Sequence, residues 1–403
     1  MSKVAILGFG VVGSGVAEVL TQNGAHIDGK IHDHLELKYI LDVRDFPDSP
    51  FADKMVKDFA VIEADPEVDI VVETIGGAKI AWEFTKRALA AGKNVVTSNK
   101  ELVAAHGFEL MELAQSKGVS YLYEASVGGG IPILRPLKQC LAANEITEVY
   151  GILNGTTNYI LTRMIRSGLP FGEALKEAQQ NGYAEADPTA DIEGHDACRK
   201  ICILASLAFG RHVYPEQVPT QGITGVSLAD VAYADACGRK IKLLGRAKRG
   251  EDGKVRAYVA PHLVSEENPL AGVEDVFNAI TVRGNAVGDV MFYGRGAGKL
   301  PTASAVVADV MECARTKGQA KHLDWGPGSE DAVVPPDDVA SAWYVRAEAS
   351  TEKLRRAFGE VVPLARSGAP AGECAALTPK LCPQELMDKL SGIKTLSVFR
   401  VLD

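Results

Sequence analysis

A glycine-rich turn near the N-terminus constrains the fold of this chain more than any other feature of its sequence. The run Gly8-Phe9-Gly10-Val11-Val12-Gly13 directly follows the short apolar stretch of residues 4–7 and opens residues 11–20, whose apolar positions have helical spacing. In such a turn the first glycine permits the tight bend, the second lets the backbone approach a pyrophosphate, and the third allows close packing of helix on strand. The helix N-terminus adds free N–H groups and partial positive charge. We therefore expect a dinucleotide to bind at Gly8, Phe9, Gly10, Val11, Val12 and Gly13; the alternative is a glycine-rich turn that binds nothing.

Strands and helices alternate through the first third of the chain. Residues 35–43, 70–73, 94–98 and 119–124 are predicted strands, and the continuous β-branched run at 70–73 predicts burial on both faces. Residues 80–91 and 102–116 are predicted helices. This alternation predicts an α/β fold whose N-terminal unit, residues 1–130, is a Rossmann-type doubly wound parallel sheet.

The rest of the chain divides into further units. Residues 131–320 have a looser α+β pattern, with predicted strands at 148–153 and 255–263 and predicted helices at 159–166, 171–181 and 195–209. Residues 325–338 combine glycine, proline and acidic residues and are predicted to be a linker. Residues 339–403 follow the order strand, helix, strand, strand, helix, strand, and this βαββαβ pattern is typical of a small ferredoxin-like domain.

Composition and charge narrow the class of partner. A hydrophobic fraction of 46% and a charged fraction of 24% indicate a soluble globular protein. The net charge of −9, without any long basic run, argues against a nucleic-acid partner. The seven cysteines include neither a C-x-x-C pair nor a zinc-spaced Cys/His set, so we expect reduced thiols in a cytoplasmic protein. Glycines and Glu18 interrupt the apolar N-terminus, which argues against a signal peptide, and no later segment reaches the length of a membrane span. A small molecule is the expected partner.

Charged residues follow the second predicted strand, where the cofactor is selected. An acid there grips the ribose 2′-hydroxyl of NAD(H), whereas an arginine accommodates the 2′-phosphate of NADP(H). Asp42 and Asp45 flank Arg44, the only cation that the sequence puts close to that strand end, so we expect NADP(H) rather than NAD(H). Solvated loop charges are the alternative. Thr74 and Lys100 follow later strands, at the sheet edge where ligands lie. Thr74 is a candidate contact of the cofactor ribose, and Lys100 is either part of the reaction centre or a solvent-exposed strand-end lysine.

Carboxylates cluster in residues 181–200, just before and within a predicted helix. Asp196 and Lys200 are four residues apart and share a helical face. Spacing alone is consistent with a surface ion pair worth a few tenths of a kcal/mol, in a helix whose acidic start suits the macrodipole. The cluster consists of Glu185, Asp187, Asp191, Glu193 and Asp196.

The whole segment resembles the homoserine dehydrogenase family. Its pattern, from Ala178 through Gly182-Tyr183-Ala184, Asp187-Pro188, Asp191-Ile192, Gly194 and Asp196 to Lys200, agrees with the family's motif at every specified position. Further stretches that resemble the family are the N-terminal turn and residues 97–100, 124–132, 153–158 and 294–305, so the resemblance spans about residues 1–320. It implies an NAD(P)-dependent oxidoreductase that interconverts L-homoserine and L-aspartate 4-semialdehyde, in the biosynthesis of threonine, methionine and isoleucine.

The resemblance also implies roles for individual residues and a homodimer built from the middle region. The implied catalytic residues are Lys200, Asp196 and Lys100. Lys100 and Gly298 join the glycine turn, Arg44 and Thr74 in the implied cofactor site. The implied substrate-binding residues are Gly155, Thr156, Tyr183, Glu185, Asp191, Asp196 and Lys200. A monovalent cation such as sodium is implied at Glu124 and at the main chain of Val127, Gly129 and Ile131.

The chemistry suits these residue types. Homoserine is a zwitterion with a side-chain alcohol, so its pocket needs carboxylates for the ammonium and lysines or N–H groups for the carboxylate. A positioned general acid/base contributes typically ~10²–10⁴-fold, and a lysine serves when burial or a second cation lowers its pKa. If Lys100 and Lys200 meet at one site, each provides the second cation for the other. The sequence leaves open which of them transfers the proton.

The tail resembles the ACT domain that many members of this family carry, with one departure. The junction between its first strand and first helix reads Glu348-Ala-Ser-Thr-Glu-Lys353 and contains neither proline nor glycine, so the backbone lacks the freedom that close approach to a bound amino acid requires. We expect the fold to persist with amino-acid sensing weakened or lost. Two rival functions are a dehydrogenase of another small amino acid, which should lack the 178–200 motif, and a catalytically silent cofactor-binding regulator.

Overall fold

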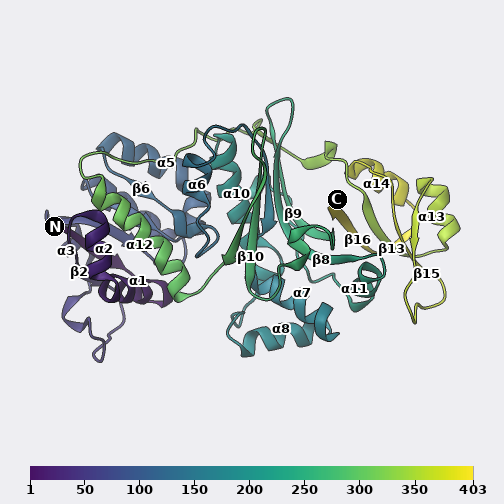
Figure 1. The fold of residues 1–403 in the computed structure, drawn as a ribbon, viewed down its shortest axis with the longest axis horizontal. Coiled ribbons are helices and arrows are strands. Elements are labelled where there is room, and N and C mark those ends of the chain that lie inside the picture. The colour runs from purple at the N-terminus through teal and green to yellow at the C-terminus, as the bar shows by residue number, and fades with distance from the viewer. Residues whose placement is uncertain (403) are drawn as a thin grey trace.

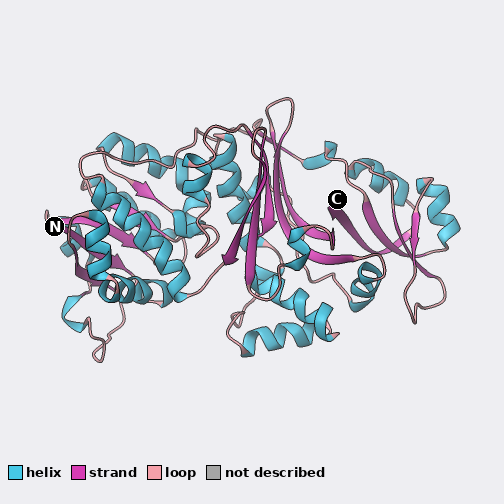
Figure 2. Cartoon of the chain, in the orientation of Figure 1, coloured by secondary structure: helices cyan, strands magenta, loops and turns pink. Residues whose placement is uncertain are grey.

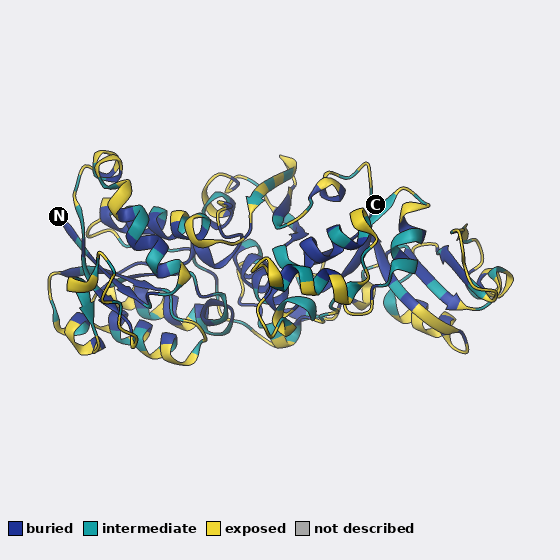
Figure 3. Cartoon of the chain, turned by 90° about the horizontal axis from the view of Figure 1, so that it is seen from below, coloured by how far each residue is buried: buried dark blue, intermediate teal, exposed yellow. Residues whose placement is uncertain are grey.

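The chain is an elongated molecule in which an N-terminal sheet, a central sheet and a tail follow one another along the long axis (Figure 1). The computed structural model describes residues 1–402. The inner strands of both sheets are largely buried, whereas exposed residues gather on the outer helices and loops and on the edge strand of residues 288–295 (Figure 3). Within residues 1–402 no helix is long and apolar enough to cross a membrane, and all seven cysteines are free thiols.

The N-terminal sheet has six strands, all parallel, in the order β3-β2-β1-β4-β5-β6. This confirms the predicted parallel sheet, and the run at Ile70, Val71 and Val72 is buried as its composition predicts. Chain order reverses between β1 and β4, the point at which such sheets bind dinucleotides. The strands are β1 (Ser2–Leu7), β2 (Leu35–Leu41), β3 (Met55–Val56), β4 (Val68–Glu73), β5 (Asn94–Thr97) and β6 (Tyr121–Leu122). The helices are α1 (Val11–Gln22), α2 (Gly24–Ile31), η1 (Ala52–Lys54), α3 (Phe59–Ala64), α4 (Lys79–Ala90) and α5 (Lys100–Lys117).

A helix that follows the central strands in sequence packs onto the N-terminal unit and completes it. α12 (Lys299–Arg315) packs against α1, and Figure 1 shows it among the N-terminal helices. A Cβ atom on Gly15 would lie 2.9 Å from the main-chain oxygen of Lys299, so the two helices are in backbone contact. The Lys299 Nζ also lies 2.6 Å from a carboxylate oxygen of Glu18. The N-terminal unit is therefore discontinuous in sequence, and the expected boundary at residue 130 leaves out one of its helices.

The second sheet is mixed and runs through both the central region and the tail, in the order β11-β10-β7-β8-β9-β16-β13-β15-β14, with β12 paired to β9 beside this path (Figure 2). Its central strands are β7 (Ile146–Ile152), β8 (Arg239–Arg249), β9 (Val255–Ser265), β10 (Phe277–Gly284), β11 (Gly288–Arg295) and β12 (Val333–Val334). The central helices are η2 (Glu124–Ser126), α6 (Leu134–Gln139), α7 (Gly155–Ser167), α8 (Phe171–Gln180), α9 (Thr189–Ile192), α10 (His195–Phe209), η3 (Pro215–Gln217), α11 (Leu228–Asp235) and η4 (Pro269–Gly272).

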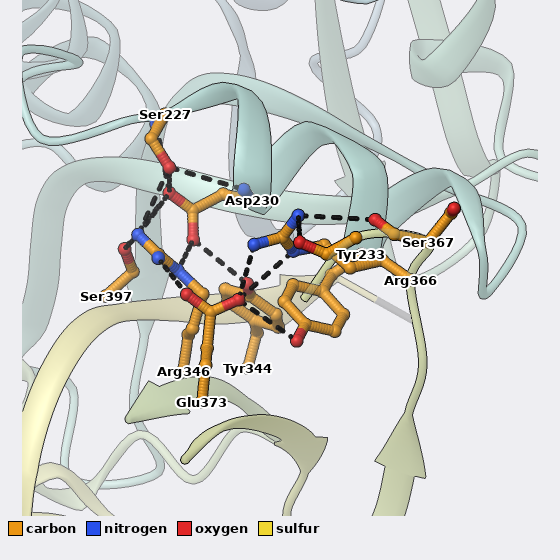
Figure 4. Close-up of polar contacts among 10 residues, drawn as sticks. Ser227, Asp230, Tyr233, Tyr344, Arg346, Arg366, Ser367, Glu373 and Ser397 are labelled. Atoms are coloured by element: carbon orange, nitrogen blue, oxygen red, sulfur yellow. Dashed lines mark hydrogen bonds and ion pairs between the residues drawn. The ribbon is translucent and has the colours of Figure 1, made fainter. Parts of the chain in front are cut away.

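The tail has the predicted strand and helix order. Its elements are η5 (Pro336–Asp338), β13 (Trp343–Glu348), α13 (Thr351–Phe358), β14 (Val362–Leu364), β15 (Glu373–Leu377), α14 (Pro383–Leu390) and β16 (Lys394–Leu402). It is not a separate sheet, because β16 pairs in parallel with β9 through Arg400–His262 to Leu402–Val264. A buried polar network beside this pairing joins α11 to the tail: Asp230 accepts hydrogen bonds from Arg346, Tyr344 and Ser397 (Figure 4).

The segment 325–338, predicted as a linker, is packed along much of its length. Trp325 is buried and donates from its indole nitrogen to Nδ1 of His212 at 3.0 Å. Val333 is also buried and pairs with Val255 through β12 and β9. Composition predicted a free connection, but apolar side chains among the prolines and glycines anchor this segment to the central region.

Candidate active site

The glycine turn has the shape that its sequence predicts. Gly8 has φ +92°, and a Cβ atom on Gly13 would lie 1.9 Å from the oxygen of Gly8, so both positions require glycine. Around Gly10 no atom of the described residues lies within 4 Å of an added Cβ, which leaves that backbone open to a ligand. The Thr74 hydroxyl lies 2.9 Å from the oxygens of both Leu7 and Gly8, so Thr74 holds the turn in place.

Two cations lie at the end of β2. Asp42 accepts the Phe9 N–H at 2.7 Å and also pairs with the Arg44 guanidinium, whose hydrogen bonds hold the pKa of Asp42 well below its ordinary value. Lys57 donates to the main-chain oxygen of Arg44 at 2.5 Å and lies 2.8 Å from Asp45. The expectation that Arg44 is the only nearby cation is therefore wrong: β3 pairs with β2 and carries the chain back to this strand end.

Lys100 is positioned by the first turn of α5. Asn99 caps this helix and donates from Nδ2 to the oxygens of Ile75 and Gly77, which ties the helix start to the loop after β4. Beneath that loop, the fully buried Glu73 accepts a hydrogen bond from Thr97 at 2.6 Å, and burial raises the pKa of Glu73 to about 7. Lys100 thus extends from a rigid sheet edge toward the central region.

One buried carboxylate holds both expected lysines. Asp196 and Lys200 lie one turn apart on α10, and the Lys200 Nζ is 2.7 Å from Oδ2 of Asp196 and 2.8 Å from the oxygen of Leu153. The Lys100 Nζ, at the start of α5 in the N-terminal unit, is 2.8 Å from Oδ1 of the same carboxylate. Burial alone would raise the pKa of Asp196, but the two ammonium groups outweigh it and hold this pKa well below its ordinary value. In turn, the charge of Asp196 raises the pKa of Lys100.

A second carboxylate lies beside this pair. Asn154, which caps α7, donates from Nδ2 to Asp191 at 2.7 Å and to Asp196 at 2.8 Å. Burial and the charge of Asp196 raise the pKa of Asp191 above its ordinary value. Asn154 thereby holds the two acids close together on one wall of the cleft.

These groups line a cavity of about 400 Å³ between the N-terminal sheet and the central region. It brings together the predicted residues Lys100, Gly155, Thr156, Tyr183, Asp191, Asp196, Lys200 and Gly298. Glu185 does not line it, and this residue is exposed on the loop after α8. Asn154, which begins the loop expected between cofactor and substrate, also lines it. The sequence prediction gave no role to the other lining residues, namely Asn181, Gly182, Val276, Arg295, Gly296 and Ala297. Residues 181–182 and 295–297 lie in stretches that resemble the family, whereas Val276 had no sequence signal.

Glu124 does not line this cavity, and its carboxylate instead accepts hydrogen bonds from the first N–H groups of a helix. Its carboxylate accepts the N–H groups of Ile133 at 2.7 Å, Leu134 at 2.8 Å and Arg135 at 2.7 Å, at the start of α6. Among residues 1–402 no group of three His, Cys, Asp or Glu side chains is arranged to hold a metal ion.

The turn, the cleft and the lysine–carboxylate cluster together define a class of protein. A dinucleotide on the turn would extend along the sheet edge to a pocket that contains two lysines and paired carboxylates, residue types that suit proton transfer. The fold and site are those of a nicotinamide-dependent dehydrogenase that acts on a small amino-acid substrate.

Comparison with known proteins gives the family. The family model for the homoserine dehydrogenase NAD binding domain matches residues 8–124, and that for homoserine dehydrogenase matches residues 132–311. The chain belongs to the homoserine dehydrogenase family. The homoserine dehydrogenase of Synechocystis sp. is 47% identical over 362 residues, with 85% of this chain and 82% of that protein covered. That of Pseudomonas aeruginosa is 42% identical over 355 residues, covering 86% and 82%. A solved homoserine dehydrogenase from Thiobacillus denitrificans superposes with TM-score 0.91 at 35% identity, covering 100% of this chain and 98% of that one.

The activity follows from family membership. The chain is an oxidoreductase that interconverts L-homoserine and L-aspartate 4-semialdehyde with a nicotinamide cofactor. The intact 178–200 motif agrees with this assignment and not with a dehydrogenase of another amino acid or a silent regulator.

Proposed function

We propose that Lys100 exchanges the proton at the substrate oxygen, while Asp196 and Lys200 hold that lysine and the substrate in place. The observation that carries this proposal is the one buried carboxylate shared by both ammonium groups. Lys200 already donates to Asp196 and to Leu153, and its side chain is 9% exposed. The Lys100 side chain is 37% exposed and faces the cavity, so its Nζ is the one that a substrate reaches.

The proposed step is a coupled proton and hydride transfer. A reduced nicotinamide, when bound at the glycine turn, would supply the hydride for the aldehyde carbon. Lys100 donates its proton to the aldehyde oxygen, so that the semialdehyde becomes the alcohol of homoserine, and the lysine regains a proton from water. The raised pKa of Lys100 keeps it protonated and ready for this direction at neutral pH. Oxidation of homoserine runs the same step backwards and needs the neutral lysine.

The cavity offers complementary groups to the rest of the substrate. Asp191 is available for the ammonium, and the N-terminus of α7, at Gly155 and Thr156, suits the carboxylate. The Thr156 hydroxyl donates to the oxygen of Tyr183 and fixes that loop beside the cavity. Glu185 contacts the ammonium only if its loop moves inward on binding.

A test separates the two lysines. Lys100→Ala and Lys200→Ala should each lower kcat at least ~10²-fold, within the range of general acid/base groups, while cofactor affinity stays nearly intact. Small primary amines should restore part of the turnover of Lys100→Ala and none of that of Lys200→Ala. Rescue of Lys200→Ala alone would exchange the two roles, and near-normal turnover in either variant would make the lysine a structural ion-pair partner.

NADP(H) is the proposed cofactor. Arg44 and Lys57 lie together at the strand end that receives the 2′ position, and Asp42 is already engaged by Phe9 and Arg44 instead of being free to grip a hydroxyl. A solved hyperthermophilic archaeal homoserine dehydrogenase in complex with NADPH superposes on 77% of this chain with TM-score 0.66 at 29% identity.

The groups near Glu124 fit a cation only through the main chain. The Glu124 carboxylate caps α6 and is not free to be a ligand, so the carbonyl oxygens of Val127, Gly129 and Ile131 are the ligands that remain for a monovalent ion. A sodium ion there would support the packing of this loop on residues 294–298, where a Cβ on Gly129 would lie 2.5 Å from the oxygen of Gly296.

The proposed domain organisation has the four segments expected from the sequence, except that one helix, α12, belongs to the N-terminal unit. Residues 1–130 with α12 form the dinucleotide-binding unit, the remainder of 131–320 the substrate-binding unit, 325–338 the connection, and 339–403 an ACT-like tail. The tail strands lie in the order β16-β13-β15-β14, as the βαββαβ pattern predicts. Met291 and Tyr293 are exposed on the edge strand β11, and this apolar edge of the central sheet supports a homodimer. We also keep the expectation that the protein is cytoplasmic.

A further inference from the structure

A small cavity lies at the seam between the central region and the tail, away from the cleft of Lys100 and Lys200. Its volume is about 220 Å³. Tyr258 on β9 and Thr220 form one side, Pro336 lies in the connecting segment, and Trp343 and Arg400 come from the tail strands β13 and β16. Its walls are therefore mainly aromatic and apolar, with the polar side chains of Thr220 and Gln221 and a single guanidinium.

Arg400 is held rigidly but lacks a carboxylate partner. The residue is 6% exposed, and its guanidinium carbon lies 4.3 Å from the ring centroid of Tyr258 and 4.4 Å from that of Trp343. Nη1 donates to the Val339 oxygen and the Ser341 hydroxyl, both at 3.2 Å. Within residues 1–402 neither Nε nor Nη2 has an acceptor, and no ion pair includes Arg400. Burial lowers the pKa of this guanidinium and outweighs the opposing charge of Asp337, which lies nearby without forming an ion pair with Arg400.

Neighbouring arginines of the same seam are paired. Figure 4 shows Arg346 and Arg366 directed at carboxylates, with Arg346 bonded to Asp230 and Glu373, and Arg366 to Glu373. A buried charge without such a partner is costly. Two aromatic faces offset part of that cost, but no acceptor among residues 1–402 bonds to Nε or Nη2 of Arg400. This edge of the guanidinium, on a residue that lines the cavity, is the group that can receive an anion.

We propose that this cavity binds a small monocarboxylate of amino-acid size through the guanidinium edge of Arg400. A planar guanidinium held between two rings presents its N–H groups in the fork that matches a carboxylate in two-point contact. The apolar walls suit a short hydrocarbon body. A phosphate fits less well, because one cation is present and the cavity offers the dianion no second charge.

The cavity backs onto the helix that carries Asp196 and Lys200. A Cβ atom on Gly194, the residue that caps α10, would lie 3.0 Å from Thr220 and 3.3 Å from Val259, and both of these residues line the cavity. A ligand here therefore touches the support of the catalytic helix without entering the active site.

The fluorescence of Trp343, which lines the cavity, can report ligand binding. Titration of the full-length protein with butyrate, L-valine and L-serine should change tryptophan fluorescence saturably for at least one of them, at millimolar concentration or below, and Trp343→Phe should remove the change. Arg400→Lys should weaken binding at least about tenfold, because a point charge replaces the two-point contact. Arg356→Lys, at an exposed helix position whose side chain is 80% exposed, is the matched control and should bind as the parent does.

A second measurement needs no variant of Arg400. The bound carboxylate should raise the thermal unfolding midpoint of the parent protein, whereas valinol, which lacks the carboxylate, should not. Absence of saturable binding by all three compounds, equal binding of valine and valinol, or unchanged affinity in Arg400→Lys would overturn the proposal. Binding of inorganic phosphate in preference to the carboxylates would also overturn it, by making the cavity a phosphate site.

Discussion

Replacing Asp196 by asparagine tests how the shared carboxylate acts on the two lysines. The Lys100 Nζ lies 2.8 Å from this carboxylate and the Lys200 Nζ 2.7 Å. With charge centres about 4 Å apart and an effective dielectric constant of about 20, Coulomb's law gives about 4 kcal/mol for such a pair. Because 37% of the Lys100 side chain is exposed, solvent screening makes the effect on Lys100 smaller than this.

The sign of the effect follows from the charge. Asp196 raises the pKa of Lys100, so the lysine stays protonated to higher pH while the carboxylate is present. Oxidation of homoserine needs the neutral lysine, and its rate rises with pH through that pKa. In Asp196→Asn the rising limb should therefore move to lower pH, because the lysine loses the negative charge that keeps it protonated. The plateau kcat should still fall at least ~10²-fold, because the lysines lose their common anchor.

The assay is the pH profile of kcat for homoserine oxidation, measured alongside thermal unfolding to verify the fold. Asp187→Asn is the matched control: it makes the same substitution in the same segment, at an exposed side chain that bonds to Thr189. Its profile should match that of the parent protein. An unmoved limb with near-normal turnover in Asp196→Asn would reduce the cluster to an ordinary ion pair and refute the reasoning.

The remaining predictions concern the cofactor and the tail. Arg44→Ala should raise KM for NADP much more than KM for NAD, because only the 2′-phosphate loses its partner, and Lys57→Ala should do so to a smaller extent. Equal effects on both cofactors, or no effect, would mean that these cations face solvent and do not contact the cofactor. Threonine at sub-millimolar concentration should inhibit weakly or not at all, since the junction at Glu348–Lys353 is capped by Ser350 and contains no glycine. Strong inhibition of the full-length protein in that range would contradict this expectation.

Local features of the sequence were sufficient for the parts of the site that lie within one element. The glycine turn predicted β1, α1 and the open backbone at Gly10, because the steric demands of such a turn are met by a few consecutive residues. Helical spacing likewise put Asp196 and Lys200 on one face of α10, and the structure has them in contact. That Lys100 joins them came from the family resemblance, since nothing local relates residues on two helices that are far apart in sequence.

The missed features depend on contacts between distant segments. Lys57 is thirteen residues after Arg44, and it reaches the end of β2 only because β3 pairs with β2. β8 carries six cations, which mask its apolar positions; one of them, Lys242, is buried and bonds to the Val273 oxygen and to Asn158. The packing of α12 on α1 and the pairing of β16 with β9 likewise join segments more than a hundred residues apart.

The most direct test of the account is an assay of the purified protein with L-homoserine and with NADP or NAD in turn, followed by the absorbance of the reduced nicotinamide. Lys100→Ala is the matched blank. We expect that the nicotinamide is reduced only when homoserine is present and that kcat/KM is larger with NADP than with NAD. Turnover in the blank should be at least ~10²-fold lower. Failure to reduce either cofactor with homoserine, or full activity in the blank, would contradict the central claim.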